Sequence, residues 1–276
     1  MKLIFQLIMP VQAFIRLLWL LIHFAYGFIL LFVNRLFYGK QWFYGERGAH
    51  IVKNWMRRGS RILGLNIQVS GTACGGASVL VSNHISWLDI VAIAATTPVI
   101  FVSKADLQHW PIVGVLAKLT GTVFIKRGSL FAVHKTLGFL KEVNNRGRKT
   151  VFFPEGTTTR GEGVNKFNSG LFESAYISNC PVQPVAISYF NRGRPDRKIA
   201  PYVDDDHFIR HLWNLLLQRK IDLQLDFLDE MQAEKFSRQD LAQACQLRIT
   251  EVIETSAMIN ADYPVEAKEA AYVLAN

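Results

Sequence analysis

The chain of 276 residues has few cysteines and few charged side chains, and an ordinary share of glycine. Its three cysteines, Cys74, Cys180 and Cys245, are odd in number, far apart and without CxxC spacing. They exclude a disulfide scaffold and indicate reduced thiols. Only 19 glycines exclude a collagen-like repeat, and 50% hydrophobic against 19% charged residues excludes intrinsic disorder. The length suits one large or two small domains with a sizeable core.

Acidic residues are almost missing from the first 61 positions. This segment holds nine Lys and Arg residues against the single acid Glu46, a net charge of +8, whereas the remaining 215 residues carry only +1. Nucleic-acid binders usually spread basic residues over a folded recognition face. Here the basic residues flank and follow an apolar stretch, which favours an anionic membrane surface. We therefore expect membrane lipids, and no nucleic acid, as partners.

The N-terminal segment contains a long apolar run. Leu17 to Val33 is seventeen residues without a formal charge, bracketed by Arg16 and Arg35. About 17–25 such residues are needed to cross a bilayer. A cleaved signal peptide is disfavoured by the length of the run and the missing cleavage site. A spanning helix and a hairpin or tilted helix in one leaflet both stay open, since Pro10 and Arg16 divide the segment; a buried core helix ranks lowest.

Aromatic side chains in and after this run support the membrane interpretation, because aromatic belts lie at headgroup level. They are Trp19, Phe24, Tyr26, Phe37, Tyr38, Trp42, Phe43 and Tyr44. Basic residues crowd the segment that follows the run, which predicts that the rest of the chain faces the cytoplasm.

The remainder of the chain alternates short β-branched runs with amphipathic segments, as in an α/β domain with a layered, mixed sheet flanked by helices. Strands are predicted at 67–70, 78–82, 99–103, 122–125, 150–153 and 182–189, the last interrupted by Pro184. Helices are predicted at 45–63, 89–95, 112–119, 130–144 and 169–178, and from the capping box Ser237-x-x-Asp240 to about residue 264. We divide the chain into an anchoring segment (1–40), a main domain (41–230) and a C-terminal helical extension (231–276).

His84 and Asp89 follow the strand predicted at 78–82, where buried parallel strands present functional residues. On a continuous helix, two residues five apart point about 140° away from each other. They meet only if His84 lies in the loop and Asp89 in the first turn of the next helix. A histidine backed by a carboxylate is a general base. The alternative is a structural histidine beside an aspartate that caps the helix.

Two further clusters end predicted strands. Lys126 and Arg127, followed by a glycine, suit a phosphate, or are simply solvated cations. The turn Glu155-Gly156-Thr157, with Arg160 close behind, has hydroxyls and backbone N–H groups for an anion and a carboxylate for a substrate hydroxyl. Pro181 to Ile187, an apolar stretch with two prolines, could wall a pocket.

Together these segments resemble a known family. NHxSWLD at 83–89, GxVFIxR at 121–127, FPEGT at 153–157 and PVxPVAI at 181–187 match, in order, the four motifs of the HxxxxD glycerolipid acyltransferases related to bacterial 1-acyl-sn-glycerol-3-phosphate (lysophosphatidic acid) acyltransferase. The resemblance covers about residues 65–190 and makes 41–230 the acyltransferase domain.

The resemblance implies a role for each motif. His84 removes the proton of the acceptor hydroxyl and Asp89 orients it. Arg127 and the Glu155–Thr157 turn bind a glycerophosphate acceptor, and Lys104 matches a lysine between the first two motifs. No metal and no cofactor are implied beyond the acyl donor, acyl-CoA or acyl carrier protein. One departure is Thr158, where many members have arginine; Arg160 stands two residues later.

The resemblance therefore implies acyl transfer to lysophosphatidic acid, giving phosphatidic acid in phospholipid synthesis. One alternative is the same chemistry on another lysolipid, lyso-ornithine lipid or lysophosphatidylglycerol. Another is a membrane lipid-binding protein without activity, which the presence of both His84 and Asp89 disfavours.

Two other patterns are assigned no chemistry. His207 and His211 are spaced like metal ligands, but we expect a solvated helix start there. The basic loop at 192–198 is expected to be solvated and able to face lipid headgroups.

Overall fold

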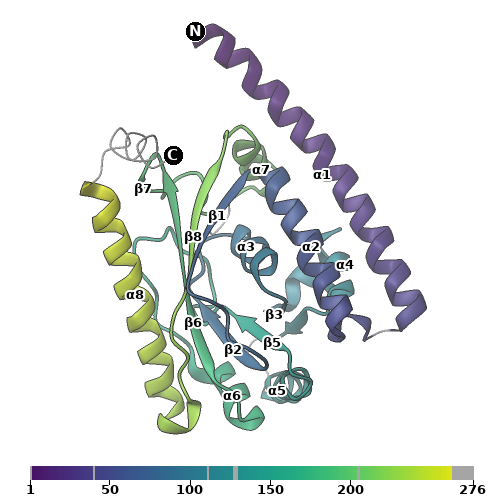
Figure 1. Cartoon of the computed structure of the whole chain (residues 1–276), viewed down its shortest axis with the longest axis vertical. Coiled ribbons are helices and arrows are strands. Elements are labelled where there is room, and N and C mark those ends of the chain that lie inside the picture. Colours follow the sequence, from purple (N-terminus) through teal and green to yellow (C-terminus); the bar gives the residue numbers. More distant parts are fainter. Residues whose placement is uncertain (1, 40, 111, 127–129, 204–205, 263–276) are drawn as a thin grey trace.

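The computed structural model describes the backbone of residues 2–39, 41–110, 112–126, 130–203 and 206–262, and the side chains of 9–39, 41–110, 112–126, 133–203 and 206–258 (Figure 1). The helices are α1 (Lys2–Tyr38), α2 (Glu46–Leu63), α3 (Leu88–Thr96), α4 (Val113–Leu119), α5 (Leu130–Asn145), α6 (Glu173–Ser178), α7 (Phe208–Leu216) and α8 (Arg238–Asp262). Short 3-10 turns are η1 (Trp42–Tyr44), η2 (Ala105–His109), η3 (Ser169–Phe172) and η4 (Ala233–Lys235). The strands are β1 (Leu65–Ser70), β2 (Ser78–Ser82), β3 (Val99–Lys104), β4 (Val123–Ile125), β5 (Lys149–Phe152), β6 (Val182–Asn191), β7 (Arg194–Pro195) and β8 (Ile221–Phe227).

The strands form one mixed sheet in the order β1-β8-β6-β2-β5-β3-β4, with β7 paired to β6. The run β6-β2-β5-β3-β4 is parallel, while β8 and β7 are antiparallel to β6. The predicted α/β class with a mixed sheet is confirmed. The carboxyl ends of β2, β5, β3, β4 and β6 therefore lie at the same edge, where parallel sheets place their sites.

The sequence prediction was wrong at three places in this sheet, the smallest being the omission of the two-residue strand β7. It omitted β8, although the strand alternates buried and half-buried residues throughout Ile221–Phe227. It also interrupted β6 at Pro184, whereas the strand is continuous there. Proline is tolerated because its carbonyl still pairs, accepting the Leu228 N–H at 3.0 Å, and only the donor side is lost.

Both faces of the sheet are covered, which gives the continuous apolar runs of the central strands. Leu80 packs in one cluster with α2, α3 and α7, and its neighbours Val79 and Val81 pack on the other face with α5, α6 and α8. Helix α8 is part of this second core through Leu241 and the residues one turn apart from it, and lies against β6 in Figure 1.

Helix α1 is one uninterrupted helix of 37 residues, so the predicted division at Pro10 and Arg16 is absent. The Arg16 guanidinium is accommodated at the end of α7, where it donates to the carbonyls of Gln218 at 2.5 Å and Arg219 at 2.9 Å. Free carbonyls at a helix C-terminus are natural partners for a cation, so this charge ties α1 to the domain instead of breaking the helix.

Within the part of α1 whose side chains are described, one stripe is buried against α2, α4 and α7. It consists of Ala13, Leu20, His23, Gly27, Leu31 and Asn34, spaced three, four or seven apart. At Gly27 a Cβ would lie 2.4 Å from Trp55 Nε1, so only glycine permits this close approach. The Trp55 ring stacks on His23 at 5.3 Å.

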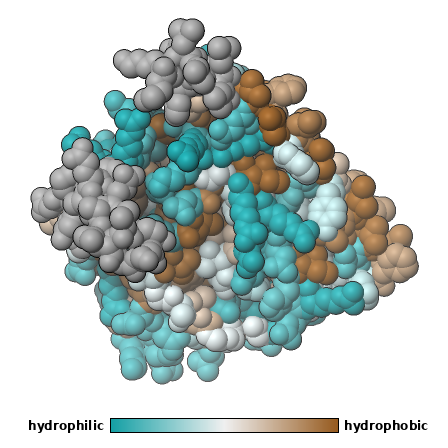
Figure 2. Space-filling model, turned by 45° about the horizontal axis from the view of Figure 1, so that its top comes forward, coloured by the Kyte–Doolittle hydropathy of each residue, from teal (hydrophilic) through white to brown (hydrophobic). Residues whose placement is uncertain are grey.

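The opposite face of α1 is apolar and exposed. Phe14 is 63% exposed and Ile29 62%, and hydrophobic residues gather along the side of the molecule on which α1 lies (Figure 2). Within the described residues, Met9–Tyr38 is the one helical segment long and apolar enough to cross a membrane. The predicted aromatic belt is wrong for Trp42, Phe43 and Tyr44, which are buried under the end of α1 rather than presented outward.

Candidate active site

The loop after β2 is held at the carboxyl edge of the sheet by the Asn83 side chain, which makes the two hydrogen bonds that another residue of the strand would make. The Asn83 side chain donates to the Ile187 carbonyl at 3.0 Å and accepts the Ile187 N–H at 2.8 Å. This pair mimics the ladder between β2 and β6 one step past the end of β2. The next residue, His84, is thereby fixed at the edge.

His84 and Asp89 meet as the loop-plus-helix geometry requires: His84 lies in the loop and Asp89 is the second residue of α3. His84 Nδ1 lies 2.7 Å from Asp89 Oδ2. The same oxygen accepts the N–H groups of Ile85 at 2.7 Å and Ser86 at 2.9 Å. Asp89 thus has two roles, helix start and histidine partner. A carboxylate on Nδ1 fixes the proton there and leaves Nε2 as the basic atom.

Tyr189 is the remaining hydrogen-bond partner of the Asp89 carboxylate. Its phenolic oxygen donates to Asp89 Oδ1 at 2.6 Å, and both side chains are buried. Burial, followed by the nearby Asp89 charge, raises the pKa of Tyr189 well above 10, so the phenol remains a donor. Four hydrogen bonds offset the cost of burying the Asp89 carboxylate. The sequence patterns did not single out Tyr189. A tyrosine in the buried part of a strand needs a partner for its hydroxyl, and this requirement could have pointed to it.

The Nε2 side of the His84 ring is open. Its side chain is 17% exposed, and among the described residues no group bonds to Nε2. The imidazole stacks on the ring of Phe153, with centroids 3.9 Å apart and planes 10° apart. Phe153 therefore holds one face of the imidazole and Asp89 holds Nδ1, while Nε2 is available to a substrate.

Glu155 is buried and bonded to backbone at both oxygens. Oε1 accepts the His84 N–H at 2.7 Å and Oε2 accepts the Asn165 N–H at 2.8 Å. Burial raises the pKa of Glu155, while the bonds from Asn165 and His84 act in the opposite direction. Gly156 makes the following turn at φ 78°, and Thr159 N–H returns to the His84 carbonyl at 2.8 Å. Glu155 of the FPEGT segment and Thr159, two residues after that segment, therefore bind the backbone N–H and the carbonyl of His84.

The cations expected at the site come from other strand ends and from the loop after β5. Lys104 ends β3 and Lys126 follows β4, two and three strands from β2, and Arg160 lies on the loop beyond Glu155. All three are exposed, as is Thr157, and none of these cations has an ion-pair partner among the described residues. Arg127 lies outside the described residues. The Pro181–Ile187 motif forms β6, next to β2.

His211 differs from its expected solvated position. It is buried, and its Nδ1 accepts a hydrogen bond from Trp87 Nε1 at 3.2 Å, while His207 is exposed. Within the part of the chain that is described, no group of three metal-ligating side chains occurs. The pair spaced like metal ligands instead contributes one side chain to the packing behind Trp87.

An oriented histidine at the carboxyl edge of an α/β sheet, with Nε2 open, is typical of an enzyme that activates a substrate hydroxyl or water.

Comparisons with known proteins specify the class of enzyme. Residues 65–188 match the family described as Acyltransferase. A lyso-ornithine lipid O-acyltransferase of Pseudomonas aeruginosa is 38% identical over 194 residues, 70% of this chain and 74% of the relative. A 1-acyl-sn-glycerol-3-phosphate acyltransferase of Neisseria gonorrhoeae is 33% identical over 150 residues, 54% of this chain and 58% of the relative.

The solved structure of the 1-acyl-sn-glycerophosphate (LPA) acyltransferase PlsC from Thermotoga maritima shares the fold. Its TM-score is 0.65 at 19% identity, covering 92% of this chain and 97% of that one. The chain belongs to the acyltransferase family of these lysolipid O-acyltransferases.

Proposed function

We propose that this protein transfers an acyl chain from a thioester, acyl-CoA or acyl carrier protein, to the free hydroxyl of a lysolipid, with lyso-ornithine lipid as its acceptor. The observation that carries the reaction is the His84–Asp89 pair, with Nδ1 bonded to a fully buried carboxylate and Nε2 open. The pair requires no cofactor for this chemistry beyond the donor.

In the proposed mechanism His84 Nε2 takes the proton of the acceptor hydroxyl as its oxygen attacks the thioester carbonyl. The new C–O bond forms, the C–S bond breaks, and the imidazolium returns the proton to the departing sulfur. Asp89 stabilises the imidazolium between these steps. Tyr189 and two backbone N–H groups hold the Asp89 side chain in place.

The acceptor assignment rests on the FPEGT loop and on the relatives. Position 158 is threonine, so this loop has one cation fewer than the common motif, and Arg160 is exposed two residues on. An ornithine headgroup carries a carboxylate and an ammonium group in place of a phosphate, and so needs less positive charge. Lyso-ornithine lipid acyltransferases of Pseudomonas aeruginosa and Brucella abortus align over 70% and 74% of the chain.

Lysophosphatidic acid is the second candidate acceptor. Lys126 stands directly after β4 beside Arg127, and Lys104 ends the neighbouring strand. Adjacent cations on two strand ends suit a phosphate monoester.

We further propose that α1 lies along one leaflet of the membrane rather than across it, with the domain in the cytoplasm. Its buried stripe packs lengthwise on α2 and α7, so a crossing α1 would take these helices into the hydrocarbon too. Arg57, Arg58 and Arg61 of α2 are exposed and would be costly there. At the headgroup level the same residues attract anionic lipids.

Mass spectrometry of acylation products tests the assignment. Purified protein is given oleoyl-CoA or palmitoyl carrier protein with lyso-ornithine lipid, lysophosphatidic acid or lysophosphatidylglycerol, beside His84→Ala. We expect ornithine lipid as the main product, and none from the variant. Phosphatidic acid as the main product would move the assignment to the second candidate. Folded protein that acylates no acceptor would contradict the enzyme assignment and favour a lipid-binding protein.

A further inference from the structure

A patch of four cations lies on the β6–β7 hairpin and the loop that follows it. It consists of Arg192, Arg194, Arg197 and Lys198, called here the hairpin basic patch. Arg192, Arg194 and Lys198 are exposed and have no ion-pair partner among the described residues. Arg197 has one loose partner, Glu162, at 3.5 Å. The proposed mechanism uses none of these four cations.

The backbone that carries these cations has a defined turn. Arg192 and Gly193 form a two-residue turn with φ values of 52° and 76°. A left-handed backbone costs about 1–2 kcal/mol for a residue with a side chain, and asparagine or glycine is usual in such turns. An arginine held in this conformation at the tip of a hairpin suggests a use for its side chain.

The acid of this segment is turned inward. Asp196 is buried, and its carboxylate accepts the backbone N–H groups of Lys198 at 3.0 Å, Ile199 at 2.9 Å and Ala200 at 3.0 Å. The Asp196 carboxylate therefore bonds to the backbone of its own loop and does not face the solvent beside the four cations. The outward face of the segment remains strongly positive.

The hairpin basic patch is connected to the catalytic loop by short steps. Tyr189, which holds Asp89, lies on the same strand three residues before Arg192. Arg197 meets Glu162, which belongs to the loop whose Thr159 bonds to the His84 carbonyl at 2.8 Å. A partner seated on the patch is therefore next to the catalytic edge.

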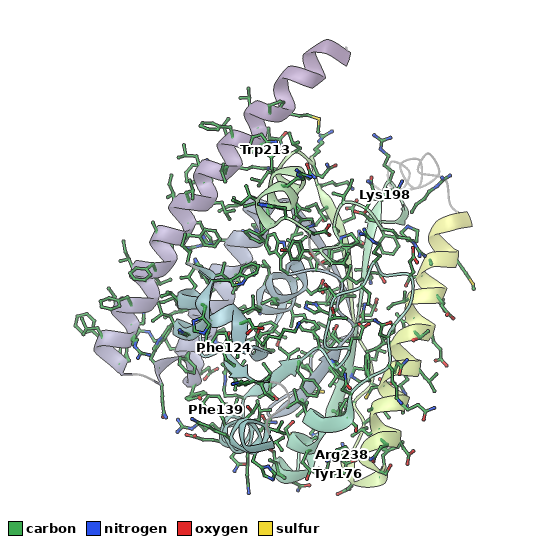
Figure 3. All side chains as sticks on the ribbon, turned by 180° about the vertical axis from the view of Figure 1, so that it is seen from behind. Phe124, Phe139, Tyr176, Lys198, Trp213 and Arg238 are labelled. Carbon is green, nitrogen blue, oxygen red and sulfur yellow. The ribbon has the colours of Figure 1, made fainter. Side chains whose placement is uncertain are left out.

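The patch does not face the side of α1. Strand β7 packs on β6 and α8, whereas α1 packs on α2, α4 and α7. In Figure 3 Trp213 lies beside α1, while Lys198 lies across the molecule from it near the end of α8. This position disfavours a role in binding the leaflet that covers the outer face of α1.

We infer that the hairpin basic patch docks an acidic acyl carrier protein that delivers the acyl thioester to His84, an inference that rests on the proposed function. The acyl donor must reach Nε2 from a direction not occupied by the membrane. The cations are distributed over a turn, a strand and a loop, which suits the surface of a protein better than one phosphate. Complementary charge raises the rate of encounter and makes it sensitive to salt.

The test compares two donors with one acyl chain. The double variant Arg194→Glu/Lys198→Glu is assayed with palmitoyl carrier protein and with palmitoyl-CoA, using the acceptor preferred by the wild type. Lys141→Glu/Lys235→Glu is the matched control, since both lysines are exposed, on α5 and η4. We expect KM for the carrier-protein donor to rise about tenfold or more in the patch variant only, with palmitoyl-CoA kinetics unchanged. Added salt should slow carrier-dependent transfer in the wild type more than in the variant.

Three results would overturn the docking inference: wild-type protein that uses palmitoyl-CoA but not the carrier, equal losses with both donors, or loss of binding to anionic vesicles in the patch variant. A fourth measurement separates docking from catalysis. Palmitoyl carrier protein is bound to the His84→Ala protein by surface plasmon resonance, with and without the patch substitutions. Binding that the patch substitutions abolish supports docking even if no acceptor is acylated, a result that would contradict only the proposed function. Binding that they leave unchanged overturns the docking inference.

Discussion

The Glu155 carboxylate accepts the backbone N–H of His84 at 2.7 Å, although 71 residues separate them in the chain. Its other oxygen is taken by the Asn165 N–H at 2.8 Å. With Thr159 bonded to the His84 carbonyl, the loop after β5 fixes the backbone of His84 from both sides. Glu155 therefore acts in this structure as a positioning residue.

This relationship predicts the effect of Glu155→Gln. The amide nitrogen of glutamine would face a backbone N–H, so one of the two bonds is lost and a buried donor is left unsatisfied, at a cost of about 1–3 kcal/mol in unfolding free energy. We expect kcat to fall about tenfold or more, with KM for the lysolipid almost unchanged. Glu162→Gln, an exposed carboxylate in the same loop, is the control. A higher KM with unchanged kcat and stability would instead mean that Glu155 binds the acceptor.

Removing the base has the largest expected effect. His84→Ala should lower kcat by about 100- to 10,000-fold, and Asp89→Asn by a similar factor because the Nδ1 proton and the imidazolium lose their carboxylate. Initial rates by mass spectrometry measure both. His50→Ala, on the exposed side of α2, should retain full activity. An active His84→Ala enzyme would refute the mechanism.

Tyr189→Phe removes one hydrogen bond from the catalytic carboxylate. A bond to a charged group contributes about 1.5–3 kcal/mol, so we expect a thermal unfolding temperature several degrees lower and a several-fold loss in kcat. Retained kcat together with retained stability would show that Tyr189 does not position Asp89.

Tyr189 also predicts a difference at high pH. Burial raises its folded pKa well above 10, so below pH 10 the phenol is protonated in both states and its contribution to stability is complete. Above pH 10 the unfolded phenol ionises while the folded one does not, and unfolding becomes easier. The wild type should therefore lose stability between pH 9 and about pH 11 more steeply than Tyr189→Phe, as measured by thermal unfolding.

The exposed face of α1 predicts how the protein binds membranes. Phe14, Leu18 and Ile22 are 63%, 53% and 49% exposed and lie on successive turns. Changing all three to serine should weaken vesicle binding about 100-fold, since each loses about 1 kcal/mol or more of apolar burial in lipid. The folded domain should be unaffected, as shown by circular dichroism. Leu247→Ser/Met258→Ser, two exposed apolar residues of α8, is the control. Unchanged vesicle binding of the α1 variant would contradict the proposed orientation.

Thr158 predicts a change in acceptor preference. Thr158→Arg adds the cation that many family members have at this position, and charge-assisted bonds to phosphate are strong. We expect kcat/KM for lysophosphatidic acid to rise about tenfold relative to lyso-ornithine lipid. Thr158→Gln, similar in size but neutral, should leave the ratio unchanged. An unchanged ratio in Thr158→Arg would show that this loop does not contact the headgroup.

Much of this architecture was predictable from the sequence. The β-branched runs gave the positions of β2, β3 and β5 to within a residue or two, because most residues of these strands are buried on both faces and their pattern is continuous. The placement of His84 in a loop and Asp89 in a first helical turn followed from the angular spacing of helices. Charge and apolar runs likewise predicted an exposed hydrophobic segment at the N-terminus.

Only the tertiary structure decided the partners that come from distant segments. Tyr189 reaches Asp89 because β6 lies beside β2, and Glu155 reaches His84 because β5 lies on its other side. Neither adjacency is encoded in local periodicity, which specifies a strand but not its neighbours. The same is true of α1: its composition is that of a membrane helix, but the Arg16 contacts and the Gly27–Trp55 approach tie it to the domain. Local sequence determined which side chains were available for chemistry, and long-range packing determined which of them meet.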